Sequence, residues 1–323
     1  MHTPTLGIIG IGHVGSAVLQ EAVVTGNFGR IITIDIDRKI AHGEALDQHH
    51  STALSYLTHS DVFEGTYEDL KDADVIIVAA GPSIIPNDHP DGKPDRTLLA
   101  EVNAKVIHEV VGKIADVTTD PVVILITNPL DSMVFVGENV SGYPADRIFG
   151  TGTMLDSARL RRILADDCRI DPKSVDGYMM GEHGMSAVPV LSRARIGGMS
   201  ILEAEKAFGV EFDPAAIQKR VVDSAYEVLV NKGSTNAGVA RSAILLARAV
   251  LFDERSIFPV CTTLRGEYGY NGDVATSMPT LIGATGVQRR FEVSLDQWES
   301  EAFERSIASI KETIKRAKSA LGM

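Results

Sequence analysis

Two short stretches of this chain carry side chains that could perform acid–base chemistry on an anion. Asp156 and Arg159 lie three residues apart in a segment with helical spacing of its apolar residues, so both point to one face of the predicted helix. His183 follows a strand-like run and lies between Gly181 and Gly184, where the backbone can turn sharply. An aspartate to orient an imidazole, a histidine to move a proton and an arginine to bind an anion form a coherent set. Taken singly, each also fits a surface ion pair or a structural histidine.

The beginning of the chain has the pattern of a dinucleotide-binding unit. An apolar run is followed by Gly10-Ile-Gly12-His-Val-Gly15 and a helical stretch, and a second apolar run ends in Asp35, twenty residues beyond Gly15. The first two glycines let the backbone approach a pyrophosphate at the positive end of the helix. Asp35 would accept hydrogen bonds from the adenosine ribose and repel a 2′-phosphate, which predicts NAD rather than NADP. Arg38 favours NADP instead, because a nearby arginine can bind that phosphate.

Further apolar runs predict the rest of a parallel sheet. Residues 75–80 and 122–126 are continuously apolar, as expected of strands covered on both faces. Between them we predict a long polar loop over 81–95 and a helix over 97–116, with an apolar stripe of Val102, Val106, Val110 and Ile114.

Two polar residues are placed by these elements. Arg96, at the far end of the loop, could reach a substrate when the loop closes, although its spacing alone fits an exposed helix start. Asn128 follows a strand at its carboxyl end, where open parallel sheets bind ligands. Before a proline it could equally be a turn residue.

The pattern changes after residue 150, where helices dominate. We predict helices over about 153–167, 214–231 and 236–252, short strands such as Val274–Met278, and a last helix from Ser294 with Gln297 completing a capping box. The fold class is therefore α/β. Residues 1–150 are predicted to form a doubly wound parallel sheet (Rossmann), and residues 151–323 a C-terminal α+β substrate domain.

Composition narrows the functional classes. Of the 323 residues 44% are hydrophobic and 23% charged, and the net charge of −12 argues against nucleic acid as a partner. Cys168 and Cys261 are expected to be buried thiols in a reducing cytoplasm. No signal peptide or membrane-length apolar run is evident, which predicts a cytoplasmic protein.

A run of histidines raises the question of a metal. His42, His49 and His50 lie near Asp47 in a stretch predicted to be helical from Ala41 to about Leu57. Neighbouring residues on a helix point in different directions, and no second carboxylate or cysteine completes a ligand set, so we predict no metal site.

Together these motifs resemble the NAD-dependent lactate/malate dehydrogenase superfamily over nearly the whole length. The motifs are Gly10-X-Gly12-X-X-Gly15, Asn128-Pro129, Gly150-Thr-Gly-Thr-Met-Leu-Asp156-Ser-Ala-Arg159 and Gly181-Glu-His183-Gly184. Within the superfamily the likeness is closest to the L-2-hydroxyisocaproate dehydrogenase branch, which acts on 2-hydroxy acids with bulky side chains. That likeness rests on the stretches from Asp88 to Arg96 and from Lys232 to Ala240.

The resemblance implies a role for each candidate residue. His183 would donate a proton to the substrate C2 oxygen during reduction, and Asp156 would orient its ring. Arg159 would hold the substrate carboxylate bidentately. Arg96 would polarise the carbonyl, and Asn128 would hydrogen-bond substrate or nicotinamide.

The resemblance also implies a substrate pocket and an assembly. It places Ile84, Thr235 and Val239 at the substrate, and Ile84 with Ile85 would face Ala237, Gly238 and Val239 as a roomy apolar wall. Malate-specific members carry an arginine early in the loop, where this chain has Ser83-Ile84-Ile85, although Lys93 could reach a distal anion. A homo-oligomer, tetramer or dimer, is implied. Arg161 matches an arginine of the sugar-phosphate site of some lactate enzymes, but Asp176 replaces its histidine, which argues against that regulation.

Several alternatives remain open. The first alternative is an L-lactate dehydrogenase, and the second is a malate dehydrogenase. NAD-dependent glycosidases share the fold but need a Cys/His metal site beside the nicotinamide, and Cys168 and Cys261 are not set in such motifs. A non-catalytic nucleotide-binding protein would not need Asp156, Arg159 and His183 together.

Overall fold

A parallel sheet forms the centre of the N-terminal half. In the computed structural model, which describes residues 2–54, 56–83 and 99–323, its strands follow the order β3-β2-β1-β4-β5-β6. This is the strand order of the dinucleotide-binding α/β fold, as predicted. The strands are β1 (Thr5–Ile9), β2 (Arg30–Ile34), β3 (Asp61–Glu64), β4 (Val75–Val78), β5 (Val122–Leu125) and β6 (Ile148–Gly150).

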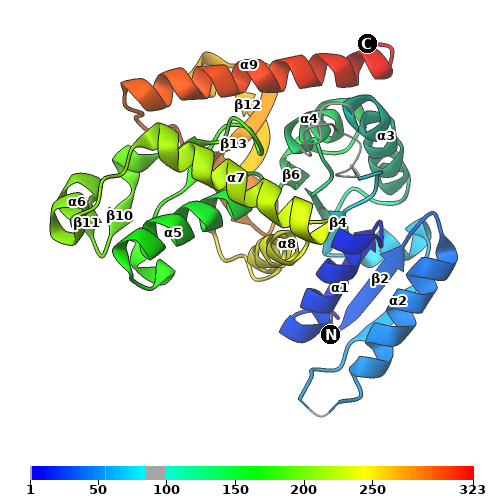
Figure 1. The fold of residues 1–323 in the computed structure, drawn as a ribbon. Coiled ribbons are helices and arrows are strands. Elements are labelled where there is room, and N and C mark those ends of the chain that lie inside the picture. Colours follow the sequence, from blue (N-terminus) through cyan, green and yellow to red (C-terminus); the bar gives the residue numbers. More distant parts are fainter. Residues whose placement is uncertain (1, 55, 84–98) are drawn as a thin grey trace.

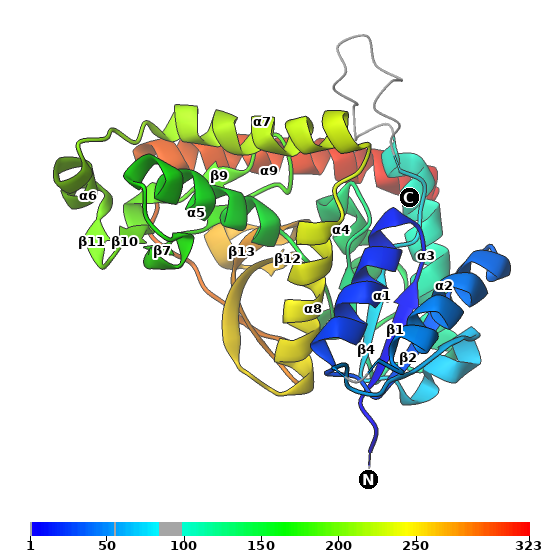
Figure 2. The ribbon, with the colours of Figure 1, turned by 60° about the horizontal axis from the view of Figure 1, so that its bottom comes forward.

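Helices cover both faces of this sheet (Figures 1 and 2). The helices are α1 (His13–Thr25), α2 (Arg38–Ser51), α3 (Ala100–Val117), α4 (Leu130–Val140), α5 (Met154–Cys168), α6 (Ile201–Phe208), α7 (Pro214–Lys232), α8 (Ala237–Leu251) and α9 (Gln297–Ala320). One face packs against α1, α2 and α8, and the other against α3, α4 and α9. In β4, Val75 and Ile77 belong to the first core while Ile76 and Val78 belong to the second, which confirms the doubly wound architecture.

Three antiparallel strands continue the same sheet beyond residue 150. They are β12 (Ser256–Arg265), β13 (Asn271–Gly283) and β14 (Gly286–Arg290). β12 joins the parallel part through the pair Cys261–Gly150. The predicted short strand Val274–Met278 is therefore wrong in length. Buried threonines and serines along β12 and β13, such as Thr262 and Ser277, interrupt the apolar pattern that a sequence reading depends on.

The remaining part of the C-terminal half is a smaller layer. Short strands lie at β7 (Val175–Asp176), β8 (Met179–Met180), β9 (Val188–Pro189), β10 (Arg195–Ile196) and β11 (Met199–Ser200). Short 3-10 turns lie at Tyr67–Asp72, Ala145–Arg147, Pro172–Ser174, Leu191–Arg193 and Glu267–Gly269. A third core, formed largely by α5, α6 and α7, holds this layer together.

Several predicted helix boundaries need correction. α2 begins earlier than Ala41, because the Asp37 side chain accepts the Lys39 N–H as an N-cap, and it ends earlier than Leu57. The predicted cap at Ser294 is wrong. Asp296 is the N-cap of α9, and Glu299 completes the capping box. The Glu299 carboxylate also accepts hydrogen bonds from the backbone N–H and the hydroxyl of Ser192.

The apolar stripe of α3 also differs from the prediction. Val102 is 49% exposed, whereas Asn103 is fully buried. The Asn103 amide donates to the backbone oxygens of Asn128 (2.6 Å) and Pro82. Asn103 thus lies on the buried face of α3 with Ala104, Ile107, Val111 and Ile114, and its polar bonds are not visible in the apolar pattern.

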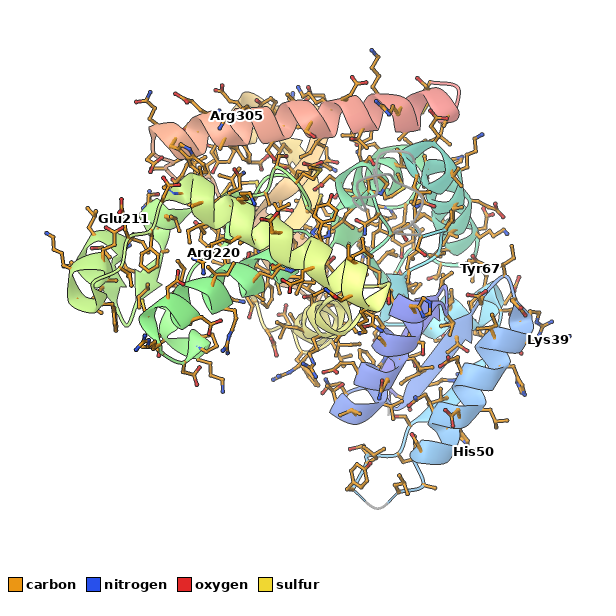
Figure 3. The ribbon with its side chains drawn as sticks, in the orientation of Figure 1. Lys39, His50, Tyr67, Glu211, Arg220 and Arg305 are labelled. Atoms are coloured by element: carbon orange, nitrogen blue, oxygen red, sulfur yellow. The ribbon has the colours of Figure 1, made fainter. Side chains whose placement is uncertain are left out.

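The outer surface carries the charge. Lys39 on α2 and Arg305 on α9 extend away from the cores (Figure 3), whereas Arg220 on α7 pairs with Asp167 on α5. No helix in the described ranges combines the length and apolarity needed to cross a bilayer.

A buried carboxylate joins α4 to the antiparallel strands. Glu138 is 5% exposed and accepts hydrogen bonds from the Thr262 hydroxyl (2.8 Å) and the Thr263 N–H (2.7 Å). Arg290 donates to the same Thr262 hydroxyl. Burial raises the pKa of Glu138 to about 7 despite these bonds.

Glu138→Gln should therefore remove a pH-dependent loss of stability. The folded-state pKa of Glu138 lies above its unfolded value of 4.5, so its contribution is fully present below pH 4.5 and is lost as pH rises through 7. Between these limits the wild type should lose about 3 kcal/mol of unfolding free energy relative to the variant. Denaturant unfolding at pH 5 and pH 8 measures this difference. Parallel pH dependence in both proteins would contradict it.

Candidate active site

A continuous cleft runs along the carboxyl ends of the parallel strands. At one end it is lined by Asp35, Gly10 and Tyr67. Gly12 and Gly81 line both this end and the middle segment, which reaches Asn128. Asn128 and His183 line both of the next two hollows, so the cleft ends at His183 and Arg159. The nucleotide motif and the acid–base residues therefore open into one groove.

The glycine motif provides room for a phosphate. Gly10 has φ +91°, and a Cβ there would lie 2.5 Å from the Ala80 nitrogen. A Cβ on Gly15 would lie 1.8 Å from the Gly10 oxygen, so Gly15 lets α1 pack closely on β1. Gly12 is different, because a Cβ there would meet no atom within 4 Å. Gly12 caps the N-terminus of α1 and faces open space, as a pyrophosphate site requires.

The acid at the end of β2 is fixed by backbone groups. One Asp35 oxygen accepts the Ile11 N–H (2.6 Å) and the other accepts the Asp37 N–H (2.9 Å). Arg38, the opposing signal in the sequence, donates its Nε–H to Glu64 on β3 at 2.6 Å. This pairing directs the guanidinium to a carboxylate at the sheet edge.

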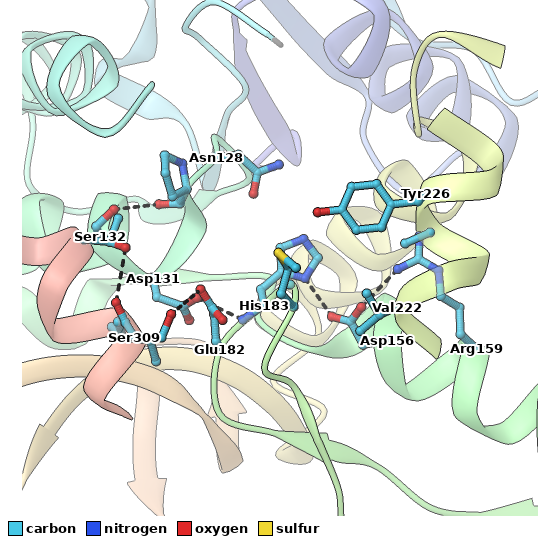
Figure 4. Close-up of a pocket in the computed structure, with 16 residues that line it drawn as sticks. Asn128, Asp131, Ser132, Asp156, Arg159, Glu182, His183, Val222, Tyr226 and Ser309 are labelled. Carbon is cyan, nitrogen blue, oxygen red and sulfur yellow. Dashed lines mark hydrogen bonds and ion pairs between the residues drawn. The ribbon is translucent and has the colours of Figure 1, made fainter. Parts of the chain in front are cut away.

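The middle of the cleft contains an unsatisfied hydroxyl. The Thr235 Oγ1 atom is buried without a hydrogen-bond partner in the described ranges, and it lies where the cleft passes from Gly12 to Asn128. Asn128 lines the same segment of the cleft, and Figure 4 shows its side chain at the edge of the pocket that holds His183. One groove therefore contains the open turn at Gly12, the fixed carboxylate of Asp35 and the unbonded hydroxyl of Thr235. This arrangement fits a nucleotide bound in an extended conformation.

Asp156 lies between His183 and Arg159 at the end of the cleft. Its Oδ2 atom is 2.7 Å from His183 Nδ1, and its Oδ1 atom is 3.0 Å from Arg159 Nη1 (Figure 4). The Asp156 side chain is 4% exposed, and those of His183 and Arg159 are 15% and 14% exposed. With Nδ1 bonded to the carboxylate, the other ring nitrogen is available to exchange a proton with a ligand.

Two hydroxyls connect the helix that carries Asp156 to the strand that precedes His183. Thr153, at the N-cap of α5, donates its hydroxyl to the Met179 oxygen of β8 at 2.6 Å. Ser157 Oγ accepts the Met179 N–H at 2.9 Å and donates to the Thr153 oxygen at 2.7 Å. The first turn of α5 is thereby attached to the segment that leads to His183.

Glycines and a second acid shape the turn at His183. Gly181 has φ +84°, and a Cβ there would lie 2.4 Å from Ser306 Oγ, while Gly184 has φ +148°. The His183 N–H donates to Asp131 Oδ2 at 2.9 Å. Sequence reasoning missed Asp131, Thr153 and Ser157. Their nearness to the motif residues was the available signal.

The pocket beside His183 has walls from the four helices α4, α5, α7 and α9. Its apolar surface comes from Val222, Ala225 and Tyr226 of α7 and from Ile310 of α9. Glu182 also lines it and accepts from Ser186 N–H at 3.1 Å and from the Ser309 hydroxyl at 3.3 Å.

Of the predicted wall on α8, Gly238 needs correction, and the contact of Val239 with a substrate stays a prediction. Val239 lines the cleft beside His183. Gly238 instead packs on Leu155, since a Cβ there would lie 2.5 Å from Leu155 Cδ1. The smallness of Gly238 therefore serves helix packing and opens no room for a ligand. Ile84, Ile85, Lys93 and Arg96 lie outside the described residues.

Other singled-out groups take no part in this cleft. In the described residues, no three His, Cys, Asp or Glu side chains gather as metal ligands. His49 accepts the Val62 N–H, His42 and His50 lie on α2, and Figure 3 shows His50 near its end. Cys168 and Cys261 are buried, free thiols. Burial lowers the pKa of Arg161, which Asp176 partly offsets.

Comparison with known proteins gives the family. Residues 5–150 match the NAD binding domain of lactate/malate dehydrogenase, and residues 153–321 match the alpha/beta C-terminal domain of that family. The chain is 40% identical to L-lactate dehydrogenase 2 of Clostridium acetobutylicum and 39% identical to L-lactate dehydrogenase of Selenomonas ruminantium, in each case over 96% of both chains.

Solved structures agree with this result. The malate dehydrogenase of Cryptosporidium parvum superposes with a TM-score of 0.91 at 30% identity, covering 98% of this chain and 99% of that one. The minor L-lactate dehydrogenase of Enterococcus mundtii gives 0.90 at 30% identity, covering 98% of both chains. The chain thus belongs to the lactate/malate dehydrogenase family and is an NAD-dependent 2-hydroxy acid dehydrogenase.

Proposed function

We propose that this enzyme interconverts L-2-hydroxy acids and 2-oxo acids that carry a bulky apolar side chain, of the 2-oxo-4-methylpentanoate type. Residues 1–150 form the NAD-binding part and residues 151–323 the substrate part of the proposal. The observation that carries it is the Asp156 carboxylate between His183 and Arg159, which faces an apolar pocket at the end of the cleft.

His183 is the proposed acid and base of the reaction. NADH, when bound, supplies the hydride that reaches C2 of the 2-oxo acid. His183 donates a proton to the C2 oxygen during reduction and takes it back during oxidation. The Asp156 contact at Nδ1, 2.7 Å long, fixes the orientation of the ring and leaves its other nitrogen for the substrate.

The remaining roles concern binding. Arg159 holds the substrate carboxylate through a planar pair of N–H donors, which an ammonium could not match. Gly12 would leave room for the pyrophosphate at the N-terminus of α1, Gly10 and Gly15 would allow the tight turn and the close packing of α1 behind it, and Asp35 would bind the adenosine ribose.

Four further residues complete the proposed substrate site. Asn128 binds substrate or nicotinamide, and Thr235 and Val239 border the reacting atoms. We retain Arg96 as the group that polarises the carbonyl and Ile84 as part of the substrate wall.

The charge of the pocket favours a monocarboxylic substrate. In the described lining Arg159 is the guanidinium, whereas Asp131, Asp156 and Glu182 are acids. The side of the pocket formed by Val222, Ala225 and Ile310 is apolar. A second substrate carboxylate would meet Glu182 and lose water without a cation in that lining, which is unfavourable. Each methylene buried against Val222, Ala225 and Ile310 should contribute about 0.8 kcal/mol.

We also propose a cytoplasmic homo-oligomer, a tetramer or a dimer. The free, buried thiols of Cys168 and Cys261 are consistent with a reducing compartment.

A panel of four substrates tests the proposed specificity. Under one set of conditions, kcat/KM for 2-oxo-4-methylpentanoate should exceed that for pyruvate by tens-fold, because several extra carbons are buried. Phenylpyruvate should also be reduced, and oxaloacetate should be the poorest substrate. A lead for oxaloacetate that Lys93→Ala abolishes would refute the apolar pocket, and failure with every 2-oxo acid would refute the function.

Pyruvate is the second candidate substrate. The curated relatives at 40% and 39% identity are named L-lactate dehydrogenases, which favours a small side chain. In the same panel, pyruvate as the best substrate would establish this second candidate in place of the first.

Cofactor choice should depend on Asp35 and Glu64 together. NADH should be strongly preferred by the wild type, because Asp35 repels a 2′-phosphate. Asp35→Ser should reduce the preference, and adding Glu64→Gln should reduce it further by freeing Arg38 to bind the phosphate. The measurement is the ratio of kcat/KM values for NADH and NADPH. In the double variant, Arg38→Ala should reverse the second gain; equal use of both cofactors by the wild type would contradict the role of Asp35.

A further inference from the structure

A second buried acid contacts the backbone of His183. Asp131 lies in the first turn of α4, is 4% exposed, and accepts the His183 N–H at 2.9 Å. It comes from the opposite side of the cleft to α5, which carries Asp156 (Figure 4). The histidine is therefore held at its ring by one helix and at its backbone by another.

Asp131 is buried among other ionisable groups, so its charge affects them. Burial and the negative charge of Glu182 raise the pKa of Asp131 to about 7, while the charge of His183 lowers it. The Cys261 thiol on β12 also interacts with this carboxyl, and burial raises the pKa of that thiol well above 9.0. Asp131 is thus electrostatically coupled to His183 across the turn.

We propose that Asp131 is a positioning residue for His183, which fixes the 182–183 peptide through the N–H bond and adds a second negative charge that stabilises the protonated imidazole. This inference rests on the proposed function, since it assigns the proton donor to His183. Asp131 itself touches the histidine backbone, whereas Asp156 touches the ring.

The charges around His183 allow a prediction of sign. In the described part of the chain, the groups that face it are Asp156 and Arg159 from α5, Asp131 from α4, Tyr226 from α7 and the adjacent Glu182. Cys261 of β12 faces Asp131. Removing the charge of Asp131 leaves Asp156 as the acid bonded to the ring, so the imidazole should lose its proton at lower pH.

The same helix offers a matched control. Glu138 is also a buried carboxyl of α4 with a pKa raised to about 7, but its partners are Thr262 and Thr263, away from the cleft. Glu138→Gln removes a similar buried charge from the same helix without touching the His183 turn.

Three variants separate geometry from charge. Asp131→Asn keeps an oxygen that can accept the His183 N–H, so it should retain most of the turnover. Its alkaline limb of kcat/KM for 2-oxo acid reduction should move about one unit lower, since reduction needs protonated His183. Asp131→Ala also loses the acceptor, and kcat should fall at least about tenfold, because misplacement of a reacting group is costly. Glu138→Gln should leave the pH limb unchanged.

A measurement that does not depend on enzyme activity tests the same proposal. The His183 imidazole can be titrated by NMR in the NADH-bound protein, with His183→Ala to assign its signal. A pKa about one unit lower in Asp131→Asn, but not in Glu138→Gln, supports the proposal. An unchanged His183 pKa in Asp131→Asn overturns it, whether or not Asp131→Ala folds. Failure of the wild type to reduce any 2-oxo acid would refute the proposed function alone, because the titration would still report the coupling.

Discussion

The structure depends on a carboxylate that is almost completely removed from water. Asp156 is 4% exposed on its side chain, and a charge at such a position is costly unless charged partners surround it. His183 and Arg159 provide that compensation at 2.7 and 3.0 Å. The same two contacts that make burial of the acid tolerable also fix the positions of His183 and Arg159, the groups that we propose act on a 2-oxo acid. Removing His183 or Arg159 would take away one of the groups that stabilise the buried carboxylate of Asp156. The same side chains would thus affect both the stability of the fold and the proposed reaction.

Much of the second half of the chain serves to keep these partners aligned. Thr153 and Ser157 attach the first turn of α5 to Met179 of β8, which leads directly to the turn at His183. Gly150 of β6 pairs with Cys261 of β12, so the nucleotide-binding sheet continues into the antiparallel strands. The cleft therefore lies along one continuous sheet, and the end with Asp35 and the end with His183 are held in a fixed relation.

The sequence predicted the parts whose signal is local. Apolar runs gave the parallel strands, and glycine spacing with Asp35 gave the nucleotide site. The triad followed from residue types and from the family resemblance. Long-range polar contacts were not predictable. Asn103 is buried on α3 because its amide donates to the Asn128 oxygen. Buried polar residues such as Thr262 and Ser277 interrupt the apolar pattern of β12 and β13, so the length of these strands was not predicted. Asp131 and His183 are hydrogen-bonded although they are 52 residues apart in the sequence. Gly238 was misinterpreted because its Leu155 contact comes from a distant helix.

The central claim is that His183, oriented by Asp156, is the proton donor at the C2 oxygen. The most direct test is the single-turnover rate of NADH oxidation by 2-oxo-4-methylpentanoate in the wild type and in His183→Ala. The variant should be slower by roughly 10²–10⁴-fold, the usual weight of general acid catalysis, while its affinity for NADH stays unchanged. A variant that binds NADH normally and turns over at close to the wild-type rate would remove His183 from the mechanism.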